Sequence, residues 1–345
     1  MNEILTYAEA INDAIKISIK RDKKVILLGL GVDDPKGVFG TTKGLKNYFP
    51  QNIFDMPTAE NGFTGFALGL SISGYRPVIV HQRVEFSLLS LEQIFNQIAK
   101  WHYMSAGTVP VPIVIRLIVG KGWGQGPQHS QSLETIFSHI PGLKVVCPST
   151  PEDARGLMIS SIKDNNPVIF FEHRWCHNIK GKINKDPKNY KIGKAKIISK
   201  GKKLSLISYS YSTLECVYAA NILRKNGIMC EVLDLRTLAP IDKKAILDTA
   251  KKTKKVLIVD NGMKKFGISS EISSIIHENL KNIYVERMGV LETPLPSSVA
   301  LSKHCYPEHE KIINKVRKIL RIRKKIIFSK KKNPDQPNKE FIGPF

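Results

Sequence analysis

The stretch DMPTAENGFTGFALGLSISGYRPV (55–78) decides the fold class, because it joins a buried helix to an apolar strand. Its apolar side chains recur at helical spacing at Phe63, Phe66, Ala67 and Leu70. The glycines between them indicate that another element packs close to this helix. Glu60 does not fit the pattern, since its carboxylate stands at the entrance to an otherwise apolar helix.

The same alternation of helices and strands continues on both sides of this stretch. We expect strands at 24–32, 76–82, 111–120, 143–149, 167–173, 203–210, 229–236, 255–261 and 281–288. We expect further helices at about 6–20, 88–105, 151–164, 212–226, 241–252 and 267–279. Continuous strands rich in Val and Ile are typical of parallel sheets covered on both faces. The sequence therefore predicts an α/β protein with two open, mostly parallel α/β domains.

Changes in composition divide the chain into segments. A first domain is expected at 1–180 and a smaller one at 203–320. Residues 181–202 are polar, rich in Lys, Asn and Gly and weakly periodic, which predicts a linker. Residues 321–345 form a basic tail. With 345 residues in all, each domain is long enough to bury its own core.

The composition is globular, with 42% hydrophobic and 24% charged residues. No stretch approaches the roughly 20 apolar residues of a membrane span, and the amphipathic start does not have the pattern of a secretion signal. Five cysteines lie far apart and none forms a CxxC pair, which fits unpaired, buried thiols in a reducing compartment. We therefore expect a cytoplasmic protein.

The formal net charge is +23, and positive charge is most concentrated near the C-terminus. Residues 311–332 contain eleven Lys or Arg and no acid. Such a run could bind nucleic acid, anionic lipid or an acidic protein. No nucleic-acid-binding motif with interleaved aromatic residues accompanies it. We favour a solvated final helix that continues into a basic tail, and we expect no nucleic-acid partner.

Three further stretches are candidate sites. The glycine-rich loop VGKGWGQGPQHSQ (119–131) matches neither phosphate-loop pattern, but loops at the carboxyl ends of strands meet ligands. It would carry His129 into a site, unless His129 is an ordinary hydrogen-bonded loop residue. HRWCH (173–177) lacks the second cluster that would complete a metal site. Arg236 and the turn VDNGMKKFG (259–267) are weaker candidates.

Polar residues also end the strand that follows the Glu60 helix, in VHQRVEF (80–86). His81, Gln82 and Arg83 could form a polar rim around a pocket or a strand end wetted by solvent. Arginine suits a carboxylate or a phosphate, because its planar guanidinium can donate to two oxygens. The sequence contains no motif of a serine hydrolase, a zinc peptidase or a kinase.

Together these pieces resemble the beta subunit of the E1 component of the 2-oxo acid dehydrogenases. These are thiamine diphosphate enzymes that decarboxylate pyruvate or branched-chain 2-oxo acids. The resemblance runs in order from about residue 3 to 320 and includes FDMPTAENGFTGFALG, AKWHYMSAGTVPVPIVIR, QHSQSLE, PGLKVVCPSTPEDARGLMISSIKDNNPVIFFE and LDLRTLAPID. Transketolases share the fold and the glutamate, but QHSQ and DNNPV look more like the dehydrogenase group. The resemblance implies a pyrimidine-binding domain followed by a transketolase C-terminal-like domain.

The resemblance also implies roles for single residues. Glu60 matches the glutamate that activates thiamine diphosphate, a task that needs a carboxyl group of elevated pKa in a dry pocket. His129 matches a loop histidine that steers the substrate or the acyl transfer to lipoamide. Residues matching the aminopyrimidine pocket are Thr58, Gln82 and Phe86. Residues matching a structural potassium site are Asp164 and Asn166, with carbonyls near Ile113, Ser161 and Ile162.

One expected motif is missing. In this cofactor class Mg²⁺ and the diphosphate are held by a GDG…N motif, which this sequence lacks. In the E1 family the motif lies on a separate alpha chain, so the resemblance implies an α2β2 assembly that is inactive without that chain. A lipoyl-bearing E2 chain is the default acyl acceptor, although another carbonyl compound could take its place. The chain could also be half of a split transketolase-like carboligase or a non-catalytic subunit.

The chain departs from the family pattern at His81, Gln82 and Arg83, which are more basic than we expect in pyruvate and branched-chain enzymes. We therefore hypothesise that His81 and Arg83 face a substrate more polar or more anionic than pyruvate. HRWCH and the basic tail are further departures.

Overall fold

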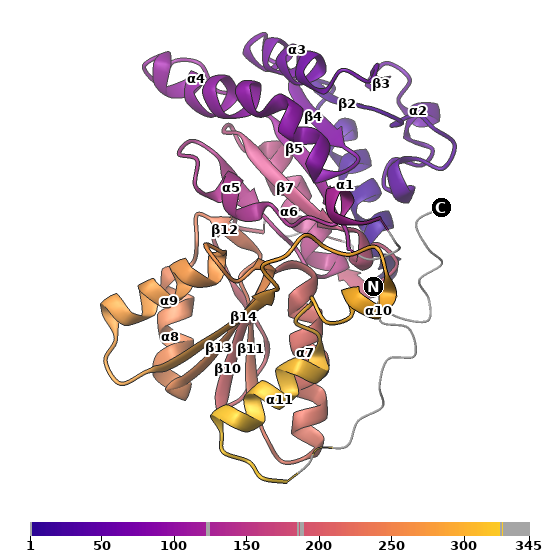
Figure 1. Cartoon of the computed structure of the whole chain (residues 1–345). Coiled ribbons are helices and arrows are strands. Elements are labelled where there is room, and N and C mark those ends of the chain that lie inside the picture. Colours follow the sequence, from indigo (N-terminus) through magenta and orange to yellow (C-terminus); the bar gives the residue numbers. More distant parts are fainter. Residues whose placement is uncertain (1, 122–124, 185, 187–189, 325, 327–345) are drawn as a thin grey trace. The chain divides into compact units, whose positions relative to one another are not determined.

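The computed structural model shown in Figure 1 describes residues 2–121, 125–184, 186, 190–324 and 326. The chain forms two compact units. Among the described residues, the first unit lies within 2–121 and 136–192, and the second within 125–135 and 193–326. The loop at 125–135 therefore belongs to the second unit, although in sequence it lies inside the first.

The first unit is built on a parallel sheet with the strand order β6-β7-β5-β4-β2-β3. These strands are β2 (Val25–Gly29), β3 (Ile53–Asp55), β4 (Arg76–His81), β5 (Val114–Val119), β6 (Lys144–Val146) and β7 (Val168–His173). β2, β5 and β7 are buried along their whole length, which explains their unbroken apolar sequences.

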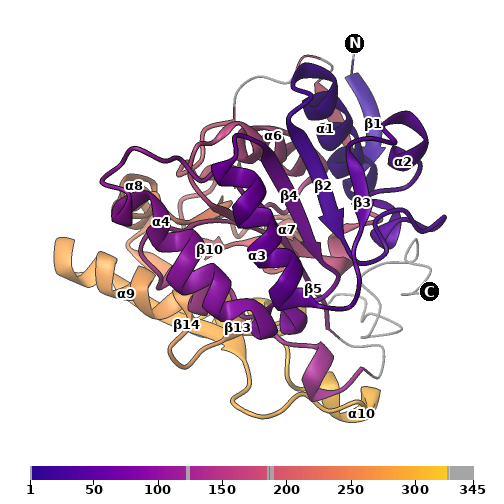
Figure 2. The same ribbon diagram turned by 90° about the horizontal axis from the view of Figure 1, so that it is seen from above.

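Helices cover both faces of this sheet (Figure 2). α3 (Glu60–Ile72) connects β3 to β4, and α4 (Ala99–Met104) lies in the connection from β4 to β5, so both crossovers run toward the β6 edge of the sheet. α6 (Pro151–Lys163) connects β6 to β7 and runs in the opposite direction. Because such crossovers are right-handed, α6 lies on the opposite face from α3. It packs there against α1 (Tyr7–Arg21), whose first turn is closed by a capping box between Thr6 and Glu9.

The second unit contains a smaller sheet with the order β14-β13-β10-β11-β9. Its strands are β9 (Lys196–Ser199), β10 (Leu204–Ser208), β11 (Cys230–Asp234), β13 (Lys255–Met263) and β14 (Tyr284–Val290). All pairs are parallel except the edge pair β9–β11. Its longer helices are α7 (Ser210–Lys225), α8 (Lys243–Thr253), α9 (Ile268–Asn279) and α11 (His309–Ile319).

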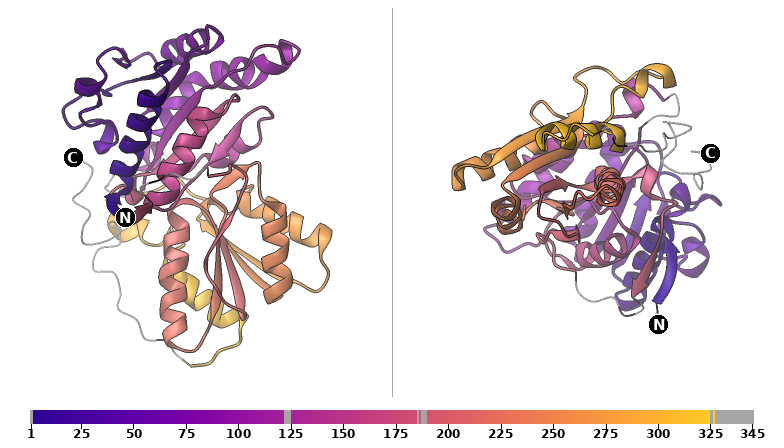
Figure 3. Two further views of the ribbon diagram at one scale, coloured as in Figure 1. Left: turned by 180° about the vertical axis from the view of Figure 1, so that it is seen from behind. Right: turned by 90° about the horizontal axis from the view of Figure 1, so that it is seen from below.

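The helices of the second unit form two layers (Figure 3). α7 packs against α11 on one side of the sheet, and α8 packs against α9 on the other. A buried cluster that includes Leu206, Val232 and Val316 joins the sheet to α7 and α11. The prediction of two open, mostly parallel α/β domains is thus confirmed.

Two of the expected segments differ in kind from what the structure shows. The expected helix at 88–105 is a 3₁₀ helix (Val84–Ser90), a π-helix (Glu92–Ile98) and α4 in succession. The segment 181–202, expected to be a linker, contains most of β8 (Lys180–Asn184) and all of β9. β8 pairs with β1 (Asn2–Thr6), and β9 is an edge strand of the second sheet.

Two expectations from composition are tested by the structure. All five cysteines are buried and free, as predicted. Within the part of the chain that the structure describes, no helix has the length and apolar character needed to cross a membrane. The expected tail at 321–345 lies mostly outside the described residues.

Candidate cofactor and substrate site

The carboxyl ends of β2 and β4 lie side by side in the first unit. The connection after β2 leads to β3 on one side and the connection after β4 leads to β5 on the other, so the strand order reverses here. Ligands of open α/β sheets bind at such reversal points. Gln82 directly follows β4 at this point, and its Nε2 donates to the carbonyl oxygen of Leu30 at 2.6 Å. Gly31 has a left-handed φ of 70°, and a Cβ added to it would lie 2.5 Å from the same Nε2, so a larger residue there would displace the Gln82 amide.

Glu60 begins α3, which starts at the same edge of the sheet, and it is 8% exposed. Among the described residues nothing forms a hydrogen bond or an ion pair with its carboxyl group. Burying a carboxyl group without a partner is costly. The arrangement therefore suits a ligand that brings its own hydrogen-bonding group, as the aminopyrimidine of thiamine diphosphate does.

Two other predicted pocket residues lie near Glu60 in the chain or the fold. Thr58 precedes α3 by two residues and is exposed. Phe86 is half-buried in the 3₁₀ helix, which packs against α3. An exposed hydroxyl and a half-buried ring leave both residues accessible to a ligand.

His81 does not lie in the solvent-facing rim that the sequence suggests. It is buried under α3, where its Nε2 lies 3.3 Å from the Thr64 hydroxyl and its ring lies 5.1 Å from that of Phe63. Burial lowers the pKa of His81 to about 3, so the imidazole is neutral at pH 7. His81 therefore supports the helix that carries Glu60 and offers no positive charge to a substrate.

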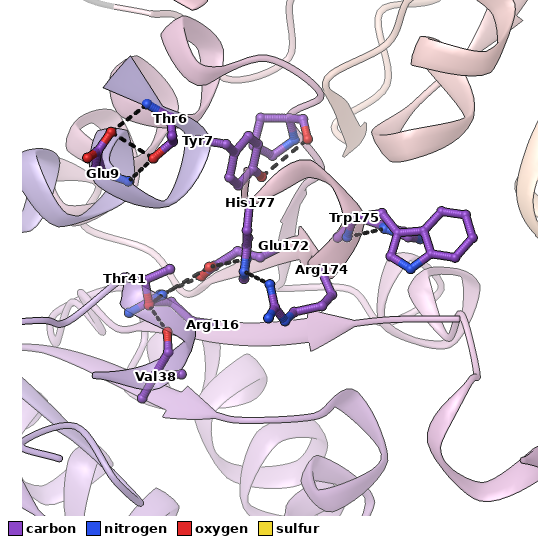
Figure 4. Close-up of polar contacts among 12 residues, drawn as sticks. Thr6, Tyr7, Glu9, Val38, Thr41, Arg116, Glu172, Arg174, Trp175 and His177 are labelled. Atoms are coloured by element: carbon purple, nitrogen blue, oxygen red, sulfur yellow. Dashed lines mark hydrogen bonds and ion pairs between the residues drawn. The ribbon is translucent and has the colours of Figure 1, made fainter. Parts of the chain in front are cut away.

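A buried charged cluster lies at the carboxyl ends of β5 and β7 (Figure 4). Arg116 donates to both carboxylate oxygens of Glu172, at 2.5 and 2.9 Å, and to the Thr41 hydroxyl at 2.7 Å. His177 lies 3.5 Å from Glu172. Burial alone would raise the pKa of Glu172, but Arg116 and His177 hold it below its usual value. Glu172 is therefore a carboxylate that already serves two partners.

Two more cations adjoin this cluster. The Arg174 guanidinium lies 4.4 Å from the centre of the Phe39 ring, and one of its nitrogens lies 3.5 Å from His177 Nδ1. Lys121 Nζ lies 4.6 Å from the centre of the Trp175 ring. Both residues are more than nine-tenths buried. Neither residue stands out in the sequence as a single site residue.

The HRWCH stretch does not assemble into a metal site. Across the described ranges no three His, Cys, Asp or Glu side chains are grouped in a way that could hold a metal ion. His177 instead faces Glu172 and Arg174, and His173 accepts a hydrogen bond from the Trp175 amide. The two histidines thus organise the loop after β7.

The loop that carries His129 is tied to the turn after β13 of the second unit. His129 ends a short 3₁₀ turn and is partly buried. Beyond it in the loop, Ser132 Oγ and Glu134 Oε1 accept hydrogen bonds from Asn261 Nδ2 at 3.2 and 2.9 Å. Burial raises the pKa of Glu134 to about 7. The turn VDNGMKKFG, proposed as a ligand-facing point, therefore supports this loop.

Arg236 is not free to meet a ligand in the way the sequence suggests. Its guanidinium donates from Nε at 2.9 Å and from Nη2 at 2.5 Å to the carbonyl oxygen of Lys194. Its backbone is left-handed, with φ 57°, and its amide is held by Asp234. Arg236 thus fixes the segment that enters the second sheet.

The residues predicted to bind potassium lie together at the end of α6. Asp164 Oδ1 accepts hydrogen bonds from the amide and side chain of Asn166, and Oδ2 pairs with Lys144 at 2.5 Å. Arg76 donates to the carbonyl oxygens of Ile162 and Asp164. The carbonyls of Ser161 and Ile113 accept backbone hydrogen bonds. Each oxygen has a second lone pair, so a potassium ion would share them with these donors.

Comparison with known proteins gives the class of the chain. Residues 3–176 match the family model "Transketolase, pyrimidine binding domain", and residues 193–312 match "Transketolase, C-terminal domain". A solved structure described as "Split gene transketolase, inactive beta4 tetramer" superposes with a TM-score of 0.77 at 20% identity, covering 93% of this chain and 99% of that one. At that identity the likeness concerns the fold alone.

Relatives in sequence are more specific. The chain is 36% identical to a pyruvate dehydrogenase E1 component subunit beta of Rickettsia bellii, covering 92% of this chain and 99% of the relative. It is 37% identical to an acetoin:2,6-dichlorophenolindophenol oxidoreductase subunit beta of Cupriavidus necator, over 92% and 98%. A mitochondrial pyruvate dehydrogenase E1 subunit beta of Mus musculus is 37% identical, over 92% and 91%. The chain belongs to the transketolase-like family of thiamine diphosphate enzymes, in the group of E1 beta subunits of 2-oxo acid dehydrogenases.

Proposed function

We propose that this chain activates thiamine diphosphate in a 2-oxo acid dehydrogenase E1 and works only together with an alpha subunit. The observation that carries the proposal is Glu60, a buried carboxyl group at the start of α3 with no partner among the described residues. When bound, thiamine diphosphate supplies a carbon nucleophile that adds to the 2-oxo group and accepts the electrons released on decarboxylation.

The chain's own residues would prepare this chemistry. Glu60 would hydrogen-bond N1′ of the aminopyrimidine and share a proton with it, which would favour the tautomer that acts as a base. Gln82 and Phe86 would line the ring, and Thr58 would lie at the edge of the pocket near Glu60. The apolar body of α3 keeps water from the carboxyl group, so that a proton can be shared rather than lost to solvent.

His129 would act on the substrate side of the reaction. A histidine can hold or give a proton near neutral pH, and we assign it the steering of the substrate or of the acyl group toward a lipoyl-bearing E2 acceptor. The alpha chain would supply Mg²⁺ and the diphosphate site. We propose an α2β2 tetramer, located in the cytoplasm because the free cysteines suit a reducing compartment.

The test is Glu60→Gln in the complex purified through this chain from its own cells. We expect turnover of 2-oxo acids to fall by about 10²- to 10⁴-fold, as when proton transfer by a positioned side chain is lost. Glu271→Gln is the matched control, because Glu271 lies in the first turn of α9 and is exposed. Unchanged turnover in Glu60→Gln would refute the proposal and favour a non-catalytic subunit.

A further inference from the structure

A pocket of about 600 Å³ lies at the C-terminal end of α11 in the second unit. Pockets of this size commonly hold small molecules. Its lining contains four cationic side chains and no acid. The lining residues are Asn314, Arg317, Lys318, Arg321, Ile322 and Arg323. All of them belong to the second unit, whereas Glu60 and Gln82 belong to the first.

The backbone that follows α11 is folded into a defined turn. The amide of Arg321 donates to the carbonyl oxygen of Lys318 at 3.1 Å. The amide of Ile322 donates to the carbonyl oxygen of Arg317 at 2.9 Å. With the left-handed φ of 55° at Arg321, these two bonds make the Schellman motif that ends many helices. Glycine is the usual residue at the left-handed position, because a side chain there costs free energy. Arg321 therefore occupies a position where glycine would be more favourable for the backbone.

Side chains hold this turn on the folded domain. Ile322 packs against the buried cluster that joins the sheet to α7 and α11, and Ile326 is part of that cluster. Arg317 is half-buried, and its Nε donates to the carbonyl oxygen of Lys324 at 3.0 Å. Its Nη2 donates to the carbonyl oxygen of Arg323 at 3.3 Å. The positive groups around the pocket are thus carried by an anchored turn.

One acid interacts with these cations, but it has a closer partner. Glu286 of β14 forms an ion pair with Lys315 at 2.8 Å. Lys315 is the main cause of the lowered pKa of Glu286, and Lys318 has a smaller effect. Arg321 and Arg323 are both exposed. Within the described ranges, neither of their guanidinium groups forms a hydrogen bond or an ion pair.

The charge at the end of the helix explains only part of this arrangement. The last carbonyl groups of a helix attract cations, and Arg317 and Lys318 lie in the last turn of α11. Arg321 and Arg323 lie beyond that turn. Like charges held close together repel one another. A bound anion would therefore relieve this repulsion and also accept charged hydrogen bonds.

We infer that this pocket binds a small molecule with two or more phosphate groups, through the side chains of Lys318, Arg321 and Arg323. The arginine at the left-handed position carries the inference, because it brings a guanidinium group to the pocket at a cost to the backbone. Each guanidinium can donate to two oxygens of one phosphate group. A small molecule is favoured over a nucleic acid, since the cations line a single pocket of about 600 Å³.

Titration calorimetry of the full-length chain at fixed ionic strength tests the inference, with pyrophosphate and orthophosphate as probes. We expect pyrophosphate to bind, and orthophosphate to bind at least about tenfold more weakly because it offers a single phosphate group. The chain lacks the GDG…N motif that holds the diphosphate of the cofactor. Binding of pyrophosphate to the chain alone is therefore separate from the cofactor site.

Arg321→Gly separates the charge of this side chain from its effect on folding. Glycine adopts the left-handed backbone without strain, so we expect unchanged or higher thermal stability. Pyrophosphate binding should weaken by about tenfold, the effect of losing charged hydrogen bonds. Arg323→Met should weaken it in the same direction. Lys254→Gly is the matched control and should leave binding unchanged, because Lys254 is an exposed cation with φ 55° at the C-terminal end of α8.

Several outcomes would overturn the inference: no binding of pyrophosphate, equal binding of the two probes, or binding that both arginine variants leave unchanged. Equal weakening by Lys254→Gly would also overturn it, since the overall charge of the chain would then be responsible. A DNA single strand of about 12 nucleotides is the third probe. If it binds more tightly than pyrophosphate and Arg321→Gly weakens it, the surface binds nucleic acid and the inference is wrong. None of these results depends on turnover of a 2-oxo acid, so each leaves the proposed function standing.

Discussion

At the scale of the residue, two buried acids of this chain differ in how much of their role can be predicted from the sequence. Glu60 is visible in the sequence because it interrupts an apolar helix, and the structure places it at the start of that helix in a buried position. Glu172 is equally out of place in the strand ending FFE, but the sequence does not show its partner. Arg116 lies 56 positions earlier, and only the pairing of β5 with β7 brings the two together.

Glu134 provides a prediction about pH. Burial raises its pKa from 4.5 to about 7, so the folded chain holds a proton that the unfolded chain releases above pH 4.5. This contribution to stability is complete below pH 4.5 and is lost as the pH rises through 7, a difference of roughly 3 kcal/mol at most. Glu134→Gln should remove this slope, because glutamine has the shape of the protonated acid and keeps the acceptor for Asn261.

The measurement is urea unfolding of wild type and Glu134→Gln at pH 5 and pH 8. We expect the wild type to lose more stability than the variant over this interval. Glu231→Gln would not serve as a control, because Glu231 is itself buried and bonded to Thr249 and Lys252. Glu152→Gln is suitable, since Glu152 lies in the first turn of α6 and is partly exposed. A slope that persists in Glu134→Gln would refute the assignment.

At the scale of the element, periodicity predicts where helices and strands lie but not the details of their hydrogen bonds. The apolar spacing in 88–105 is helical, yet the structure passes from 3₁₀ to π to α geometry there. Those transitions depend on tertiary packing against α3, which a single sequence does not show. β9 was missed for a related reason, because an exposed edge strand needs only one buried face and carries a weak pattern.

The end of α6 provides a prediction about potassium. If Asp164 and Asn166 bind the ion with nearby carbonyls, K⁺ should raise the thermal midpoint by about 2–4 °C relative to Na⁺ at equal ionic strength, through preferential binding to the folded state. Asp164→Asn should abolish the difference. Asp248→Asn is the control, since that exposed acid pairs with Lys244 on the surface of α8. Equal midpoints in the two salts would remove potassium from the proposal.

At the scale of the whole molecule, the sequence indicates the class because many motifs occur in the expected order along nearly all of the chain. The sequence does not define the units in space. The loop with His129 follows β5 in sequence and yet belongs to the second unit, since Asn261 holds Ser132 and Glu134. The hydrogen bond between Asn261 and Glu134 joins residues 127 positions apart, and a single sequence does not show such long-range contacts.

The proposed partnership gives a prediction for the assembly. Native mass spectrometry of the complex purified through this chain should show two copies of it, two copies of an alpha-type chain and two thiamine diphosphate molecules. The chain alone should show no turnover of 2-oxo acids, and adding the purified partner should restore it. A homodimer without cofactor, or an isolated chain that turns over, would contradict the half-enzyme arrangement.

The attachment of the 125–135 loop to Asn261 also determines how the chain can be exchanged between relatives. A chimera that joins the first 192 residues of this chain to the second half of a relative would pair this loop with a foreign turn. Glu134 would then lose its hydrogen bond from the Asn261 side chain. The orientation of His129 would depend on whether the relative has a hydrogen-bond donor at the position of Asn261. Recombination and inheritance should therefore keep the loop and the β13 turn as a linked pair, although more than a hundred residues separate them in the gene.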